Sequence, residues 1–81
     1  MNVDVRLFAR ARDLAGAERV LVELPASARV SDLREALSEQ FPALRPLVPN
    51  LLVAIGTDYA NDAAAINPGA DIACFPPVSG G

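Results

Sequence analysis

The sequence contains no histidine and no lysine, so all seven of its basic residues are arginine. Without imidazole, the chain cannot use histidine as a general acid, a general base or a metal ligand. Without lysine, it can form no Schiff base and lacks the lysine of a phosphate-binding P-loop. A lone cysteine, Cys74, excludes an internal disulfide and a cysteine-rich zinc or iron–sulfur site. We therefore expect no bound cofactor or metal, and any chemistry must rely on a partner's catalytic groups.

Several targeting and binding features are also missing. No apolar run reaches the roughly 18 residues that a membrane span requires, and the first six residues do not resemble a signal peptide. The net charge of −3 argues against general nucleic-acid binding, which requires a basic face. A single cysteine is typical of a reducing compartment. These absences predict a cytoplasmic chain that contacts neither membrane nor nucleic acid.

Two stretches near the N-terminus show the period-two alternation of β-strands. Their apolar positions are Val3, Val5 and Leu7 in the first stretch, and Val20, Val22 and Leu24 in the second, before Pro25. The stretches are close enough in sequence to form a hairpin. Residues 10–16 between them are mostly polar and end in glycine, so we expect a connection with about one helical turn.

The apolar period changes to that of a helix at Val30 and ends at Phe41, before Pro42. Ser27 or Ser31 is expected to help cap its start, where Asp32 also suits the helix dipole. Further strands are expected at residues 51–55 and 72–75, with a turn at residues 56–58 and a short, weak strand or loop from Tyr59. This order predicts an α+β fold, in which one main helix covers one face of a sheet.

The C-terminus carries a distinctive stretch, Phe75-Pro76-Pro77-Val78-Ser79-Gly80-Gly81. Glycine has no side chain, so a Gly-Gly end can enter a narrow pocket of another protein. Proline fixes φ and lowers the entropy that an extended tail loses on binding. The alternatives are a frayed terminus and a Pro-Pro pair that only terminates the last strand. We favour a functional tail over residues 76–81, flexible and attached to a single domain.

The chain resembles the ubiquitin-like β-grasp sulfur carriers, a family that includes the small subunit of molybdopterin synthase. Besides the tail, the matching stretches are residues 5–16, residues 52–55 and residues 67–73. The resemblance covers essentially the whole chain, residues 1–81, and implies a single β-grasp domain with a mixed sheet. It departs from the family at Gly56-Thr57-Asp58, where an Asn-Gly type of turn is common.

The resemblance also implies a function and a set of partners. A ubiquitin-activating-type adenylyltransferase would use ATP to adenylate the carboxylate of Gly81, and a sulfur donor protein would convert it to a thiocarboxylate. The tail, from Pro76 through Val78, Ser79 and Gly80, would then enter the large subunit of molybdopterin synthase. There the sulfur would pass to cyclic pyranopterin monophosphate. In this scheme the chain is a rechargeable co-substrate and not itself a catalyst.

Three side chains besides the tail are candidates for partner binding. Phe8 and Phe75 are out of phase with the apolar positions of their strands. In the implied fold these strands are neighbours, so the two rings would form one exposed aromatic patch, unless a twist or bulge returns one of them to the core. Arg12 is either a docking residue for the activating enzyme or part of a solvated loop. Cys74 alternates with Phe75, which favours a buried, inert thiol.

Other functions remain open at this stage. A sulfur carrier for thiazole (thiamine) synthesis would share the fold, the tail and the activation step. A ubiquitin-like protein modifier would join Gly81 to lysines of other proteins. An interaction domain with an incidental Gly-Gly end is the third alternative. The stretch from Phe75 to Val78 favours the molybdopterin branch.

Overall fold

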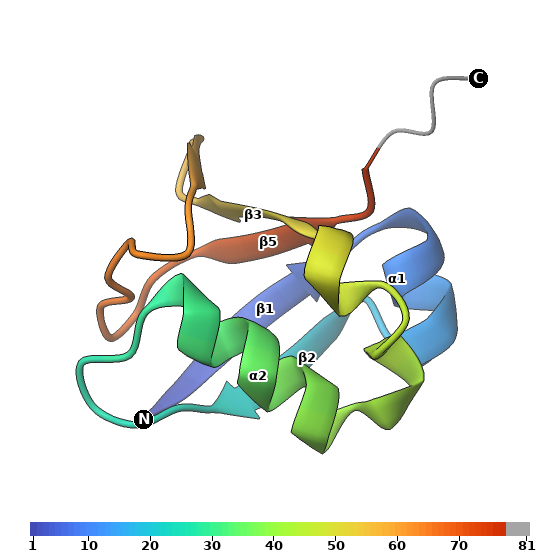
Figure 1. The fold of residues 1–81 in the computed structure, drawn as a ribbon, viewed down its shortest axis with the longest axis horizontal. Coiled ribbons are helices and arrows are strands. Elements are labelled where there is room, and N and C mark those ends of the chain that lie inside the picture. The colour runs from blue at the N-terminus through green and yellow to red at the C-terminus, as the bar shows by residue number, and fades with distance from the viewer. Residues whose placement is uncertain (78–81) are drawn as a thin grey trace.

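The computed structural model describes residues 1–77, which form one sheet with helices on one side and at one end (Figure 1). Val78, Ser79, Gly80 and Gly81, the end of the predicted tail, lie outside the described residues. The elements in chain order are β1 (Asn2–Leu7), α1 (Ala9–Ala15), β2 (Arg19–Glu23), α2 (Val30–Gln40), 3-10 turns at Pro42–Leu44 and Val48–Asn50, β3 (Leu52–Ile55), β4 (Asp58–Ala60) and β5 (Ile72–Phe75).

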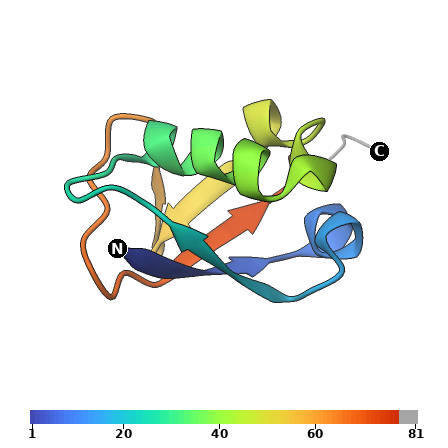
Figure 2. The same ribbon diagram turned by 90° about the horizontal axis from the view of Figure 1, so that it is seen from below.

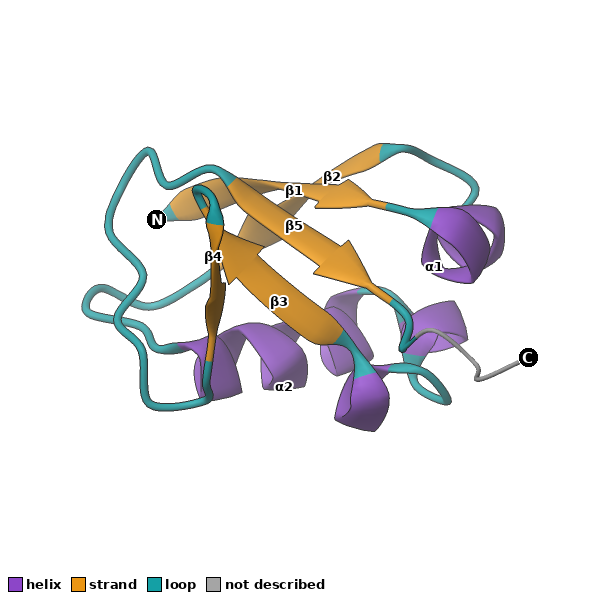
Figure 3. Cartoon of the chain, turned by 90° about the horizontal axis from the view of Figure 1, so that it is seen from above, coloured by secondary structure: helices purple, strands orange, loops and turns teal. Residues whose placement is uncertain are grey.

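The five strands are arranged in the order β2-β1-β5-β3-β4. The first and last strands, β1 and β5, are parallel neighbours, with Val5 opposite Ile72 and Leu7 opposite Cys74. The other pairings, β1 with β2, β3 with β5 and β3 with β4, are antiparallel. Figure 3 shows β5 between β1 and β3. The mixed β-grasp sheet predicted from the sequence is confirmed.

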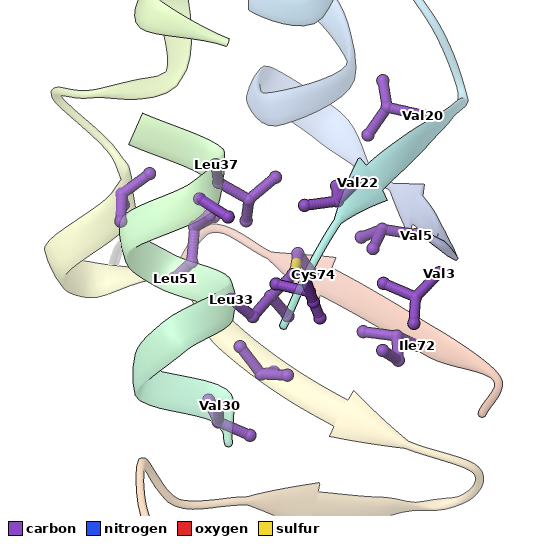
Figure 4. Packing of buried hydrophobic residues seen from close by; sticks show 14 of the residues in the cluster. Val3, Val5, Val20, Val22, Val30, Leu33, Leu37, Leu51, Ile72 and Cys74 are labelled. Atoms are coloured by element: carbon purple, nitrogen blue, oxygen red, sulfur yellow. The ribbon is translucent and has the colours of Figure 1, made fainter. Parts of the chain in front are cut away.

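One face of the sheet packs against α2, and the core lies between them (Figure 2). The apolar positions of β1 alternate as predicted, since Val3, Val5 and Leu7 are buried while their neighbours are not. Leu33 and Leu37 of α2 are fully buried against this layer (Figure 4). Within residues 1–77 no polar or charged residue is buried. The fold therefore depends on apolar burial rather than on buried ion pairs.

The segment between β1 and β2 corrects the sequence-based prediction. It forms a seven-residue helix, α1, rather than a single helical turn. Ala11 is fully buried and Leu14 packs against the core, so the segment has a short apolar side that its arginines obscure in the sequence. Gly16 ends the helix with φ of 72°, and its N–H donates to the carbonyl of Arg12 at 2.9 Å. This left-handed conformation favours glycine, which explains why the helix stops there.

The start of α2 also differs from the prediction, because neither Ser27 nor Ser31 caps it. Arg29 is the N-cap residue, and its N–H donates to the carboxylate of Asp32 at 2.8 Å. Ser27 lies in the preceding turn with φ of 62°, and Ser31 is already inside the helix. With 11 residues, α2 is the longest helix of the described chain, and none is long and apolar enough to cross a membrane.

The turn at Gly56 forms a β-hairpin despite its departure from the family pattern. Ile55 pairs with Asp58, so β3 and β4 are joined by only two residues, Gly56 and Thr57. Gly56 has φ of 64°, and glycine at the first central position is typical of a tight hairpin loop. The hairpin sets Tyr59 opposite Ala54, on the face of the sheet that α2 does not cover.

Candidate functional site

An aromatic stack lies where β1 and β5 end. Phe8 directly follows β1, and its N–H donates to the carbonyl of Cys74 at 3.3 Å, which extends the pairing of the two strands by one residue. The rings of Phe8 and Phe75 are stacked, with centroids 4.7 Å apart and planes inclined by 12°. The sequence-based expectation that these two rings meet agrees with this geometry. Their role in partner binding remains a prediction.

Two residues that the sequence analysis did not select extend the stack across the sheet. Leu52 of β3 lies directly opposite Phe75, and Tyr59 of β4 meets the Phe75 ring edge-on at 6.4 Å. The alternation of Leu52 with buried Val53 is the signal that points Leu52 outward. No pattern in the sequence predicts the position of Tyr59, because its neighbours are set by the pairing of β4 with β3. We call Phe8, Leu52, Tyr59 and Phe75 the aromatic surface.

The aromatic surface is partly open to solvent. The exposed fractions are 36% for Phe8, 41% for Leu52 and 73% for Tyr59, while Phe75 is half-buried between its neighbours. A cluster of large apolar side chains that are partly exposed to solvent is typical of a surface that a partner covers. The part of the helix-free face around Phe75 is thus the candidate docking face.

The predicted tail starts at the aromatic surface. Pro76 and Pro77 directly follow Phe75, and the first is half-buried while the second is exposed. β5 ends on the same side of the molecule as α1 (Figures 1 and 3). A partner that covers the aromatic surface would therefore lie beside the start of the tail. The tail-insertion assignments of Val78, Ser79 and Gly80, and the reactive role of Gly81, concern residues outside the described part.

Arg12 lies near the aromatic surface as well. It belongs to α1 and lines a pocket of about 200 Å³ together with Phe8. Its guanidinium reaches the carboxylates of Asp13 and Glu18 only at 4.0 and 3.9 Å. Such long, exposed ion pairs contribute little stability, so these neighbours do not account for the position of Arg12.

Cys74 belongs to the core and not to this surface. It points to the opposite face of β5 from Phe75, among the side chains that fill the space between the sheet and α2 (Figure 4). Burial raises the pKa of the Cys74 thiol from 9.0 to about 12, an effect that the charge of Arg34 offsets only in part. A thiol of this kind stays protonated and is a poor nucleophile.

The described residues offer little for chemistry of their own. Among residues 1–77, no three His, Cys, Asp or Glu side chains are grouped so that they could hold a metal ion. Their distinctive feature is the apolar surface beside the tail. The arrangement is suited to presenting the tail to another protein.

Comparison with known proteins identifies the family. The model of the ThiS family matches residues 5–81. The chain belongs to the ThiS family. A molybdopterin synthase sulfur carrier subunit from Drosophila yakuba is 37% identical over all of this chain and 92% of its own length. Thus the family resemblance predicted from the sequence is confirmed.

Two solved structures show the same fold. The crystal structure of SAMP1 from Haloferax volcanii is 31% identical, with a TM-score of 0.87 and complete coverage of both chains. A complex of subunits 1 and 2 of the molybdopterin-converting factor from Helicobacter pylori contains a chain with a TM-score of 0.68, 23% identical, again with complete coverage of both. At that identity the second likeness concerns the fold alone.

The state of Cys74 can be tested by alkylation. We expect iodoacetamide to leave the folded protein unmodified at about pH 8 and to modify it in urea, because the buried thiol stays protonated. The free energy of unfolding should also fall as the pH rises above 9.0 toward about 12, since the unfolded chain releases the thiol proton at a lower pH than the folded chain.

The Cys74→Ala variant is the control, because the difference between its pH profile and that of the wild type isolates the thiol. Equal alkylation rates for the folded and unfolded wild-type protein would show that Cys74 is accessible.

Proposed function

We propose that this chain is the sulfur carrier subunit of a molybdopterin synthase and acts as a sulfur-donating co-substrate in molybdenum cofactor biosynthesis. The observation that carries the proposal is the stacked pair Phe8–Phe75 at the point where the Pro-Pro tail leaves the sheet. The relatives with the name of this subunit match the full length of the chain, which supports the same assignment.

The reactive group in this proposal is the α-carboxylate of Gly81, the last residue of the sequence. With an ordinary pKa of about 3.3–3.7, it is an anion and a poor electrophile at neutral pH. A ubiquitin-activating-type adenylyltransferase supplies ATP, the carboxylate attacks the α-phosphate, and pyrophosphate leaves. A hydrosulfide equivalent from a sulfur donor protein then displaces AMP and leaves a thiocarboxylate. This chain contributes no catalytic side chain to either step.

The large synthase subunit is the proposed acceptor partner. Its surface covers Phe8, Leu52, Tyr59 and Phe75, and the tail enters its active site. Residues 76–81 reach at most roughly 20 Å when fully extended, at about 3.3–3.6 Å per residue. The docked domain must therefore lie within that distance of the bound cyclic pyranopterin monophosphate, to which the thiocarboxylate passes its sulfur. Because the tail is short, the position of the docked surface limits where the sulfur can go.

A protein modifier is the second candidate, favoured by the high similarity to SAMP1 of Haloferax volcanii, whose full name is small archaeal modifier protein 1. A sulfur carrier for thiazole synthesis is a third and has the same fold, so the fold does not separate the three. Mass spectrometry of the chain isolated from cells separates a carrier from a modifier, and a transfer assay with the large synthase subunit separates the two kinds of carrier. We expect a mass increase that corresponds to the exchange of one oxygen for sulfur at Gly81. That sulfur should be lost when the large synthase subunit and cyclic pyranopterin monophosphate are added. Covalent adducts through Gly81 on lysines of other proteins would instead establish a modifier.

Deletion of Gly81 should abolish sulfur transfer and leave the fold intact. The reason is that the reacting carbon must occupy one position in the partner's site, where a displacement of about 1 Å can cost roughly 10²-fold in rate. Thiocarboxylate yield and cofactor synthesis are the measurements, with the melting temperature as a check on folding. Normal rates for the shortened chain would exclude Gly81 as the sulfur-bearing residue.

Phe75→Ala should weaken binding to the large subunit more than it lowers stability. A central aromatic anchor contributes about 2 kcal/mol or more, equivalent to about 30-fold in Kd, while a half-buried ring loses less core packing than a fully buried one. A binding titration and thermal melting measure the two effects. Leu21→Ala is the matched control, because Leu21 is an exposed apolar residue on β2, at the far edge of the sheet. Unchanged affinity with a large loss of stability would make Phe75 a core residue.

A further inference from the structure

A basic pocket adjoins the aromatic surface and is not explained by the tail. The pocket has a volume of about 200 Å³ and lies between β1, α1 and β2. Its lining residues are Arg6, Leu7, Phe8, Arg12, Glu18 and Arg19. Three arginines and one acidic residue thus face a small hollow in a protein whose net charge is −3. The lining of the pocket is therefore more basic than the chain as a whole.

The strand register makes this arrangement costly in the free protein. Arg6 of β1 lies directly opposite Arg19 of β2 in the antiparallel pair. Like charges directly opposite each other on neighbouring strands are destabilising. An acidic residue at either position would have given an attractive cross-strand pair. Asp71 and Asp4 each pair with one of these arginines, and a bound anion would offset the remaining repulsion between the two.

The internal partners of these arginines leave most of their donors uncommitted. Arg6 donates to Asp71 at 3.2 Å and Arg19 donates to Asp4 at 3.0 Å, and both pairs are exposed. A guanidinium has five N–H donors, so each hydrogen bond uses one of five. Arg12 makes no hydrogen bond to the rest of the described chain, and the Nε of Arg6 is buried without a partner there. Exposed pairs are weak, so a bound anion can replace or share them at small cost.

We propose that this basic pocket receives one carboxylate, from an aspartate or glutamate side chain of the protein that covers the aromatic surface. The proposal rests on the proposed function, and it names the chemistry of the partner's contact. Phe8 lines the pocket and stacks on Phe75, so a single docked surface reaches both. The partner therefore presents an acidic residue beside its apolar patch.

A carboxylate fits the pocket better than a free phosphate does. The carboxylates of Asp4, Asp13, Asp71 and Glu18 surround the arginines and repel a dianion more strongly than a monoanion. A side chain held by the docked protein also has a high effective concentration, which a dissolved ion lacks. The planar fork of arginine holds either anion with two parallel hydrogen bonds, so the preference for a carboxylate rests on charge and on effective concentration.

The carboxylate contact would fix the orientation of the docked domain, which the aromatic surface alone does not. Apolar burial is non-directional, so a stack of rings alone allows the docked domain to rotate. A fixed ion pair in the pocket removes that freedom and sets the direction in which the tail leaves. Arg6, Arg12 and Arg19 then act as positioning residues and not as catalytic ones.

The test compares two double variants of the full chain in titrations with the large synthase subunit at several salt concentrations. Arg6→Gln/Arg19→Gln removes two charges from the pocket. The control, Arg29→Gln/Arg45→Gln, removes two charges outside the pocket, from side chains that donate to the carbonyls of Ala63 and Ser38. We expect the pocket variant to bind about tenfold more weakly, with a smaller dependence on salt, and the control to change little. Glu18→Gln should change affinity in the opposite direction. Melting temperatures confirm that each variant is folded.

Two results would overturn the proposal. The pocket variant could bind like the control while Phe75→Ala binds weakly. The partner would then dock on the aromatic surface without placing a carboxylate in the basic pocket, and the proposal would be wrong. If inorganic phosphate binds the free chain saturably, and the pocket variant loses that binding without losing affinity for the large subunit, the pocket belongs to a free anion. A wild-type chain that does not bind the large subunit at all would instead overturn the proposed function.

Discussion

The parallel pairing of β1 with β5 is the contact on which the rest of the molecule depends. It joins residues near the two ends of the sequence, with Val5 opposite Ile72 and Leu7 opposite Cys74. One residue further along, it sets Phe8 beside Phe75. The same pairing sets the start of the tail next to α1 and the basic pocket. The positions of the core, the candidate docking face and the start of the tail therefore all depend on the pairing of β1 with β5.

The alternation of side chains along each strand separates two tasks. On β5, Ile72 and Cys74 are buried in the core while Phe75 faces outward. A shift of one residue in this register would exchange the thiol and the ring, so a register that preserves the core also preserves the docking face. Core packing and the proposed partner contact thus involve different residues of the same strand.

Local patterns predicted the strands, the main helix and the outward direction of Phe8 and Phe75, because alternation and helical period depend only on neighbours in sequence. The length of α1 was missed, since its small apolar side consists of alanines and Leu14. Tyr59 and the Arg6–Arg19 pair were missed for a different reason. Their neighbours are set by strand register, which relates residues far apart in the chain. Leu52 was missed although it alternates with buried Val53 and lies within residues 52–55, one of the stretches that match the family.

The position of β5 at the centre of the sheet has a consequence for folding. It is the last of the described strands in the chain, and its pairing with β1 closes a loop of more than sixty residues, from Leu7 to Ile72. Contacts of such long sequence separation form late in folding. A chain that lacks β5 therefore has no Phe8–Phe75 stack, so a protein that recognised that stack would distinguish folded chains from chains truncated before this strand.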